Sequence, residues 1–303
     1  MTLQSENSVK GRTTGHSGSS RALATLASDA RVVADFVAQH GPVLVLTGAG
    51  ISTASGIPEY RDIDGNWKHA KPVQYKDFIE SAEVYQRYWA RSAVGWKTMG
   101  RARPNAGHYA LAELEQRGHV SHLITQNVDR LHAQAQHQNV VDLHGNLSTA
   151  SCLSCSNTLA RESLQQEMEA QNPNWFASVP QTTTEQKPDG DAWIAARATK
   201  HFLPPRCPTC GGKLKPDVVF FGEGIPQRII SAALRAQEQA GALLVVGSSL
   251  IVFSGFRIVR DFCARQLPVI IINQGKTRAD DLPVRKIVHD ANELLPLTAS
   301  LTQ

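Results

Sequence analysis

Four of the five cysteines fall into two Cys-x-x-Cys pairs, Cys152 with Cys155 and Cys207 with Cys210. Each pair can present two thiolates from a tight turn, and four thiolates complete the tetrahedral coordination of one zinc ion. Because that shell is closed, the zinc would be structural and would hold no catalytic water. Paired cysteines without a recognisable secretory signal favour metal binding over disulfides, the alternative being four incidental buried thiols. We assign no role to Cys263.

Amide, carboxylate and imidazole side chains follow two apolar runs. Gln126, Asn127 and Asp129 come shortly after one run, and His144 follows the next. An isolated histidine is more often structural than catalytic. Here it shares a predicted sheet edge with the other three polar residues, and an imidazole pKa of about 6.5 suits general-base catalysis at neutral pH. We therefore predict that His144 is a catalytic base.

A glycine-containing turn follows the first apolar run. The turn Gly48-Ala49-Gly50 would let the backbone approach a pyrophosphate closely, and a helix start after it would offer free N–H groups. The full Gly-x-Gly-x-x-Gly pattern fails because Thr53 occupies the third glycine position, so taken alone the motif fits an ordinary tight turn about as well. The following loop, 55–62, carries Tyr60 and Arg61 and could close over a bound cofactor.

Residues 215–223 combine a β-prone run with a glycine stop just after the second cysteine pair. The edge of a strand here could bind an extended peptide by strand addition. Ordinary sheet pairing explains the run equally well.

The elements that must position these residues alternate along the chain. Short apolar runs, each followed by a polar loop, predict buried strands at 43–46, 123–125, 243–246 and 269–272. Helical periodicity predicts helices at 22–40, 106–116, 229–239 and 256–266. This alternation predicts an α/β fold with a doubly wound parallel sheet, in which ligands bind at the carboxyl ends of the strands.

Two regions break the alternation, 62–99 and 151–215, and we expect them to form a second, smaller domain with a helical segment and the zinc-binding module. The large domain would then comprise 23–61, 100–150 and 216–303. We predict that residues 1–22 form a disordered tail; the alternative interpretation of this stretch is a mitochondrial transit peptide. The polar stretch Pro180–Asp191 is expected to be an exposed loop.

The composition narrows the possible partners. A chain of 303 residues with 42% hydrophobic content can fill a core, and its 31 basic and 27 acidic residues leave a net charge of only +4. A zinc-ribbon module that binds nucleic acid is disfavoured, because the linker between the cysteine pairs is rich in acidic residues. No apolar run approaches the ~20 residues that span a bilayer. We expect a soluble protein without a nucleic-acid or membrane partner.

Several segments, in order, resemble the sirtuin family over about residues 30–297. They are GAGISTASGIPEYRD, TQNVDRLH, LHGN, the two cysteine pairs, KPDVVFFGE, LLVVGSSL and IIIN. The segments YWARSAVGW and VVGSSLIVFSGFR, with the long insert between the cysteine pairs, are similar to the class II branch that includes the mitochondrial lipoamidase-type sirtuin. The resemblance implies a Rossmann-like domain and a small zinc domain, with NAD and an acyl-lysine substrate meeting between them. The implied activity is NAD-dependent protein deacylation that releases nicotinamide and O-acyl-ADP-ribose.

The resemblance also implies roles for individual residues. His144 would be the base, and a structural zinc would be bound by the four paired cysteines. The implied NAD-binding residues are Gly48, Ala49, Gly50, Ser52, Tyr60, Arg61, Gln126, Asn127, Asp129, Gly247, Ser248, Ser249 and Asn273. The implied peptide-binding residues are Val219, Phe220, Gly222 and Glu223.

One further pair of residues bears on which acyl group the enzyme would remove. Tyr88 and Arg91 are three residues apart on a predicted helix and therefore share a face. Tyr-x-x-Arg resembles the pair that reads acidic acyl groups in the desuccinylase branch, and a guanidinium pairs well with a carboxylate. We hypothesise activity on glutaryl-like or other long acyl groups, the alternative being that Arg91 lies on a solvated helix face.

Protein mono-ADP-ribosyl transfer at the same NAD site is the alternative activity. We expect a monomer in a reducing compartment, which is the cytoplasm if the protein is bacterial and the mitochondrial matrix if it is eukaryotic.

Overall fold

The computed structural model describes residues 16–68, 72–179, 188–192 and 196–302. In chain order its elements are α1 (His16–His40), β1 (Val43–Thr47), the 3-10 helix η1 (Ala49–Ser55), α2 (Tyr75–Glu80), α3 (Ala82–Met99), α4 (Ala106–Gln116), β2 (Val120–Thr125), α5 (Leu131–Gln134), β3 (Val140–Asp142), β4 (Gly145–Cys152), β5 (Thr158–Ala160), α6 (Arg161–Gln171), α7 (Pro173–Ser178), α8 (Ala196–Thr199), β6 (Leu214–Val218), α9 (Gln227–Glu238), β7 (Leu243–Val246), α10 (Phe253–Ala264), β8 (Val269–Ile272), β9 (Arg285–Ile287) and α11 (Ala291–Leu301).

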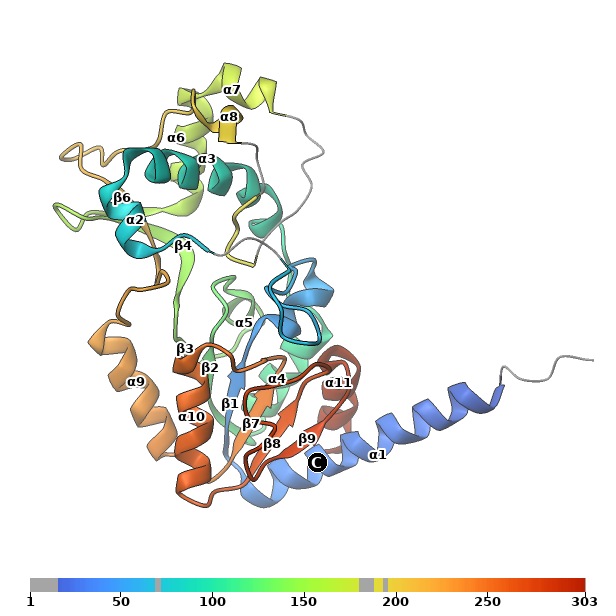
Figure 1. Ribbon diagram of the computed structural model, residues 1–303. Helices are drawn as coiled ribbons and strands as arrows, with labels where there is room; N and C mark the ends of the chain where they lie inside the picture. Colours follow the sequence, from blue (N-terminus) through green and yellow to red (C-terminus); the bar gives the residue numbers. More distant parts are fainter. Residues whose placement is uncertain (1–15, 69–71, 180–187, 193–195, 303) are drawn as a thin grey trace, which may run out of the picture.

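Six parallel strands form a large sheet in the order β3-β2-β1-β7-β8-β9 (Figure 1). Strands β1, β7 and β8 are buried along their whole length, as expected where helices cover both faces of a parallel sheet. One face packs with α1, α4 and α11, and the other with α9 and α10. The predicted Rossmann-like α/β fold is confirmed. The order of the strands reverses between β1 and β7, which is where such folds bind ligands.

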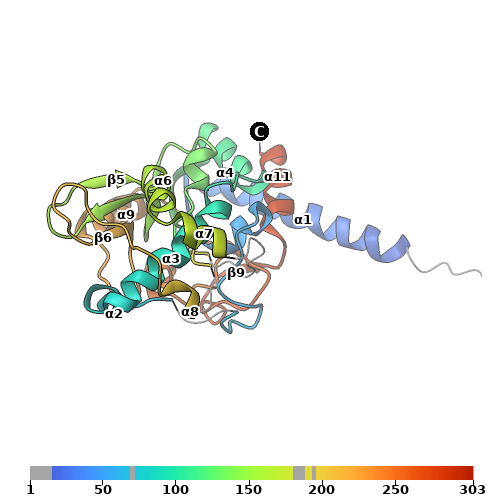
Figure 2. The same cartoon turned by 90° about the horizontal axis from the view of Figure 1, so that it is seen from above.

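A small antiparallel sheet, in the order β5-β4-β6, lies beyond the carboxyl ends of the large sheet (Figure 1). It packs with α2, α3 and α6 around a separate core whose largest fully buried members are Phe78, Tyr85, Trp89 and Phe202. Seen from above, these elements cover one side of the molecule, while α1 extends away from the rest of it (Figure 2).

The division into two domains stays a prediction, but the structure moves its boundaries. Strand β4 starts at Gly145 and pairs with β6, so residues 145–150 belong to the small sheet and not to the large domain. The sequence does not predict this strand, because its residues are mostly small and polar. At the N-terminus, residues 16–22 lie in α1 and not in a disordered tail; residues 1–15 lie outside the described residues.

Candidate active site

A cavity of about 520 Å³ opens at the carboxyl ends of the large sheet, below the small sheet. Pockets for small molecules and cofactors typically occupy about 300–1,000 Å³. The cavity is lined by every predicted NAD-binding residue, and also by His144, Tyr88, Val219, Phe220, Gly222 and Glu223. The structure therefore brings the whole predicted site together, with the exceptions of Arg91 and the cysteines.

The glycine turn is shaped by contact with the end of β7. A Cβ atom on Gly48 would lie 2.7 Å from the carbonyl oxygen of Gly247, and one on Gly50 would lie 2.8 Å from its Cα atom. Gly247 itself has a φ of 60°, which glycine adopts without strain. The helix that starts after the turn is the 3-10 helix η1. Side chains on these glycines would block the approach of the two loops across the switch point.

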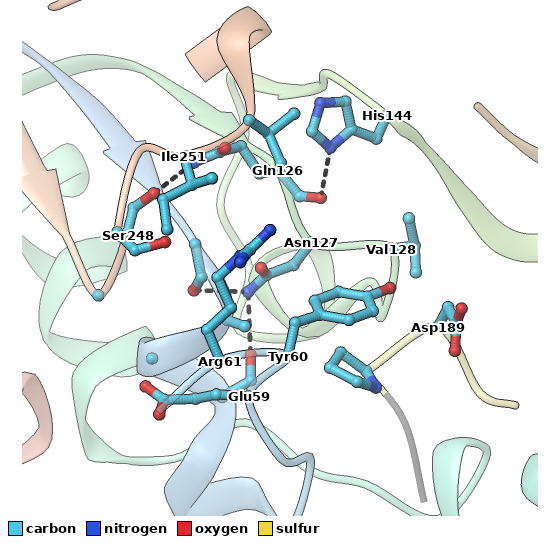
Figure 3. A pocket seen from close by; sticks show the side chains of 18 of the residues that line it. Glu59, Tyr60, Arg61, Gln126, Asn127, Val128, His144, Asp189, Ser248 and Ile251 are labelled. Carbon is cyan, nitrogen blue, oxygen red and sulfur yellow. Dashed lines mark hydrogen bonds between the residues drawn. The ribbon is translucent and has the colours of Figure 1, made fainter. Parts of the chain in front are cut away.

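The polar residues after β2 hold one another in place. Asn127 donates from Nδ2 to the Gly48 carbonyl (3.0 Å) and to Ser52 Oγ (3.1 Å), and Ser52 donates to Asp129 Oδ2 (2.8 Å). Gln126 donates from Nε2 to Ser248 Oγ (2.8 Å), as Figure 3 shows. Burial raises the pKa of Asp129, while the Leu131 N–H and the Ser52 hydroxyl lower it. These bonds cross-link the loops after β1, β2 and β7, so the polar groups of the pocket are pre-organised.

The loop after η1 is held by Trp67, a residue that no motif in the sequence indicates. The guanidinium of Arg61 stacks on the Trp67 ring, 3.8 Å from its centroid, and donates from Nη1 to the Gly65 carbonyl (2.7 Å). The Tyr60 ring packs edge-on against the same indole, with the centroids 6.1 Å apart. Tyr60 and Arg61 therefore belong to one ordered wall of the pocket.

His144 is held by two hydrogen bonds. Its Nδ1 lies 3.0 Å from the Gln126 carbonyl oxygen, and its Nε2 lies 2.8 Å from Ser254 Oγ at the start of α10 (Figure 3 draws the first bond). Because a carbonyl oxygen only accepts, Nδ1 carries the proton, and Nε2 accepts from the serine hydroxyl. Burial lowers the pKa of His144 below 6.5, against the Gln126 contact that raises it. The imidazole is thus a neutral base at neutral pH, with its lone pair on Nε2.

A cluster of three other histidines lies outside the lining of the pocket. His132 is buried between His108 and His137, with ring centroids 4.7 and 5.3 Å away, and its Nε2 lies 3.0 Å from Thr47 Oγ1. Thr47 in turn donates to Thr125 Oγ1 (2.8 Å), and Thr125 directly precedes the polar residues of the pocket in the sequence. Burial lowers the pKa of all three imidazoles, that of His108 to about 3. The cluster therefore supports the floor of the site in a neutral state.

We expect this cluster to make the fold sensitive to acid. Between pH 6.5 and about 3, His108 is protonated in the unfolded chain but not in the folded chain. The neutral His108 therefore has no effect on the free energy of unfolding above pH 6.5, and below this pH it lowers that free energy by about 1.4 kcal/mol per pH unit. Urea unfolding of wild type and His108→Phe between pH 7.5 and 5.0 measures this directly. As the pH falls, the free energy of unfolding of the variant should decrease less steeply than that of wild type, by about that amount per pH unit. Equal slopes for the two proteins would contradict the assignment.

The peptide-side residues form a loop after β6. The Val219 N–H donates to the His144 carbonyl (2.8 Å), and Glu223 accepts from the Phe220 N–H (2.8 Å) and pairs with Lys215 (3.2 Å). The carboxylate of Glu223 thus holds the loop in shape. β6 is an edge strand of the small sheet. The loop beyond it lines the pocket, and within this loop Phe221 pairs with Gln74.

The structure does not bring Arg91 into the pocket. Its Nε donates to the Ala192 carbonyl (2.8 Å) and lies 2.9 Å from Asp191 Oδ1, and both side chains of this ion pair are largely buried. Tyr88 does line the cavity, and burial raises its pKa. The Tyr-x-x-Arg spacing places both residues on α3, but the guanidinium forms its ion pair with Asp191, about a hundred positions further along the chain.

The four paired cysteines converge at the far end of the small sheet. The Sγ atoms of Cys152 and Cys210 are 3.5 Å apart and those of Cys155 and Cys207 are 3.6 Å apart, and all four lie within 4.8 Å of one another. Four thiolates around one zinc ion at about 2.3 Å stand roughly 3.8 Å apart. The cluster fits a structural zinc ion, and it stands apart from the cavity, which none of these cysteines lines.

The fold and the pocket define a Rossmann-like enzyme with a second, cysteine-cluster module. Residues 48–254 match the Sir2 family, and the chain belongs to that family. It is similar to the "NAD-dependent protein deacetylase" of Xanthomonas axonopodis pv. citri (strain 306), with 47% identity over 89% of this chain and 90% of that protein. It is also 48% identical to the "NAD-dependent protein deacetylase 2" of Bradyrhizobium diazoefficiens, over 84% of this chain and 91% of that protein.

Solved structures give the same relationship. The structure titled "Sir2-p53 peptide-NAD+" has a TM-score of 0.68 and 28% identity, and covers 86% of this chain and 93% of that one. "Sir2 bound to acetylated peptide" has a TM-score of 0.66 and 27% identity, and covers 88% and 94% respectively. The predicted sirtuin membership is confirmed.

Proposed function

We propose that this chain is an NAD-dependent protein-lysine deacylase that releases nicotinamide and O-acyl-ADP-ribose. One observation carries the proposal: the same cavity is lined by the predicted NAD-binding residues at the β1/β7 switch point, by the predicted peptide-binding residues after β6, and by His144. The names of the bacterial relatives and the peptide and NAD in the similar structures support the same activity.

The chain's own residues would divide the work as follows. The glycine turn and the 247–249 loop would hold the phosphates and adenosine, and Gln126 and Asn127 the ribose next to nicotinamide. Asp129 lies in the same network and would receive the carboxamide. When bound, NAD would supply a glycosidic bond with a good leaving group, and the pocket would orient an acyl-lysine amide against that bond. His144 would take a proton from a ribose hydroxyl at its Nε2 atom.

The pH dependence of turnover should report this base. His144 is active only when neutral, and its pKa lies below 6.5, so kcat/KM should be constant above about pH 6.5 and fall at lower pH. Ser254→Ala removes a donor that stabilises the neutral imidazole, and it should move the acid limb to higher pH. Rates of acetyl-peptide turnover from pH 5 to 9 test both statements, and an acid limb that Ser254→Ala leaves in place would contradict the second.

Four finer assignments accompany this function. We propose membership in the class II branch from the motifs around α3 and α10. We also propose that the chain acts as a monomer without a nucleic-acid partner. Among the described residues, no helix has the length and apolarity needed to cross a bilayer. The similar relatives named above are bacterial, which favours the cytoplasm over the mitochondrial matrix as the proposed location.

The test must separate deacylation from ADP-ribosyl transfer. Purified protein is incubated with NAD labelled in the ADP-ribose part and with an acetyl-lysine peptide, and the label is followed. Deacylation leaves the label in a small acylated product, and transfer leaves it on protein. The names of the relatives do not favour transfer, and label found mainly on protein would overturn the proposal.

A further inference from the structure

One tryptophan contacts two loops of the pocket that carry residues predicted to bind different ligands. Trp67 lines the cavity together with Arg61, from the loop predicted to close over the cofactor, and Phe221, from the loop after β6. The Arg61 guanidinium stacks on the indole, 3.8 Å from the ring centroid. The Phe221 ring packs edge-on against the same indole, with the centroids 6.1 Å apart. A single side chain is therefore shared by the cofactor side and the peptide side.

The cofactor side of this contact is a short hairpin. Arg61 and Trp67 form an antiparallel bridge, and the Asp62 N–H donates to the Asn66 carbonyl (3.0 Å). These bonds close residues 61–67 into the cofactor hairpin, with the guanidinium and the indole facing each other across it. The position of the indole and that of Arg61 therefore depend on each other.

The turn of the cofactor hairpin docks on the loops after β7 and β8. The Lys276 N–H donates to the Ile63 carbonyl (2.9 Å), and a Cβ atom on Gly275 would lie only 2.8 Å from that carbonyl oxygen. A Cβ atom on Gly65 would lie 3.2 Å from Ile251 Cδ1. Because these two loops also carry predicted NAD-binding residues that line the cavity, a nucleotide bound there would contact the hairpin.

The peptide side of the contact is fixed by its backbone. The Tyr75 N–H donates to the Phe221 carbonyl (2.9 Å), which ties the loop after β6 to the start of α2. Phe220 and Gly222, the two neighbours of Phe221 in the sequence, are predicted peptide-binding residues and line the cavity. A peptide bound along this loop would restrict the Phe221 ring, and the ring in turn would restrict Trp67.

We propose that Trp67 is a positioning residue that couples the binding of the peptide to the binding of NAD. The inference rests on the proposed deacylase function. Either ligand would order the loop that it contacts and, through the shared indole, the other loop as well. The second ligand would then lose less conformational entropy when it binds. The coupling is reciprocal, so NAD would tighten peptide binding by the same factor by which the peptide tightens NAD binding.

The test measures the dissociation constant of an acetyl-lysine peptide with and without a saturating NAD analogue. The nicotinamide ribose of the analogue is carbocyclic, so nicotinamide does not leave. Couplings between binding sites are typically about 5–150-fold, so we expect the analogue to tighten peptide binding at least about fivefold in wild type and less than about twofold in Trp67→Ala. Trp67→Phe keeps a ring for both contacts and should retain most of the coupling. Tyr109→Ala, which removes an exposed ring on α4 outside the cavity, should keep the wild-type factor.

This factor separates coupling from general damage, which would weaken each ligand alone without changing the ratio. Phe221→Leu removes the other ring contact of the indole and should lower the factor as Trp67→Ala does, so it provides the same test if Trp67→Ala unfolds. A wild-type factor within about twofold of one, or an unchanged factor in both variants, overturns the proposal.

Cleavage of the peptide with NAD itself is measured separately. If coupling is present but no peptide is cleaved, the proposed deacylase function fails and the role of Trp67 stands. If the peptide is cleaved but the factor is near one, the deacylase function stands and the role of Trp67 fails. Wild type that does not bind the peptide at all would overturn both.

Discussion

Replacing His144 with alanine is expected to lower kcat/KM for an acetyl-lysine peptide by at least about a hundredfold, because a positioned general base contributes roughly 10²–10⁴ to the rate. The imidazole is held by the Gln126 carbonyl and Ser254, so the variant removes a proton acceptor from the centre of the cavity. It removes no side chain of the main core clusters. The thermal midpoint should therefore change little.

His201→Ala is the matched control, because His201 is exposed and lies outside the cavity. It should retain wild-type rates. If His144→Ala keeps its turnover within about threefold of wild type while folding normally, His144 is not the base and another group at the pocket must take the proton.

Replacing Cys152 with serine should have the largest effect on stability. Cys152 and Cys207 are buried members of the cluster, and Cys152 also belongs to the core of the small sheet. Structural zinc contributes roughly 10 to 16 kcal/mol in small zinc modules, so loss of one thiolate should release the metal and unfold the elements around the small sheet. Elemental analysis and thermal unfolding measure the two consequences.

The fifth cysteine offers a control for the same change. Cys263 lies on α10 and outside the cluster, so Cys263→Ser should keep one zinc per chain. An unchanged zinc content in Cys152→Ser would refute the four-thiolate site, whereas loss of zinc from both variants would point to damage that is not specific to the cluster.

The parts of the fold that the sequence predicts well are those with strong local patterns. The predicted strands 243–246 and 269–272 coincide with β7 and β8, because strands buried on both faces are continuous apolar runs. The helix 106–116 coincides with α4, where Asn105 caps the first turn by accepting from Gly107 and His108. For these three elements the local sequence pattern is therefore sufficient.

The parts that the sequence does not predict depend on contacts between distant positions. The sequence around Arg91 does not predict its ion pair with Asp191, and the sequence around Ser254 does not predict its hydrogen bond to His144. The polar composition of Pro180–Asp191 suggests solvent exposure, yet its last residues are buried because glycines at 95 and 190 allow backbone contact. The chemistry of the acyl end of the pocket is therefore a property of the tertiary structure.

The central claim is tested most directly by the stoichiometry of one reaction. Purified protein with an acetyl-lysine peptide is followed by mass spectrometry, with and without NAD, for free-lysine peptide, nicotinamide and O-acetyl-ADP-ribose. The proposed function predicts that the three products appear in equal amounts and only with NAD. Free peptide formed without NAD, or nicotinamide formed while the peptide stays acetylated, would contradict it.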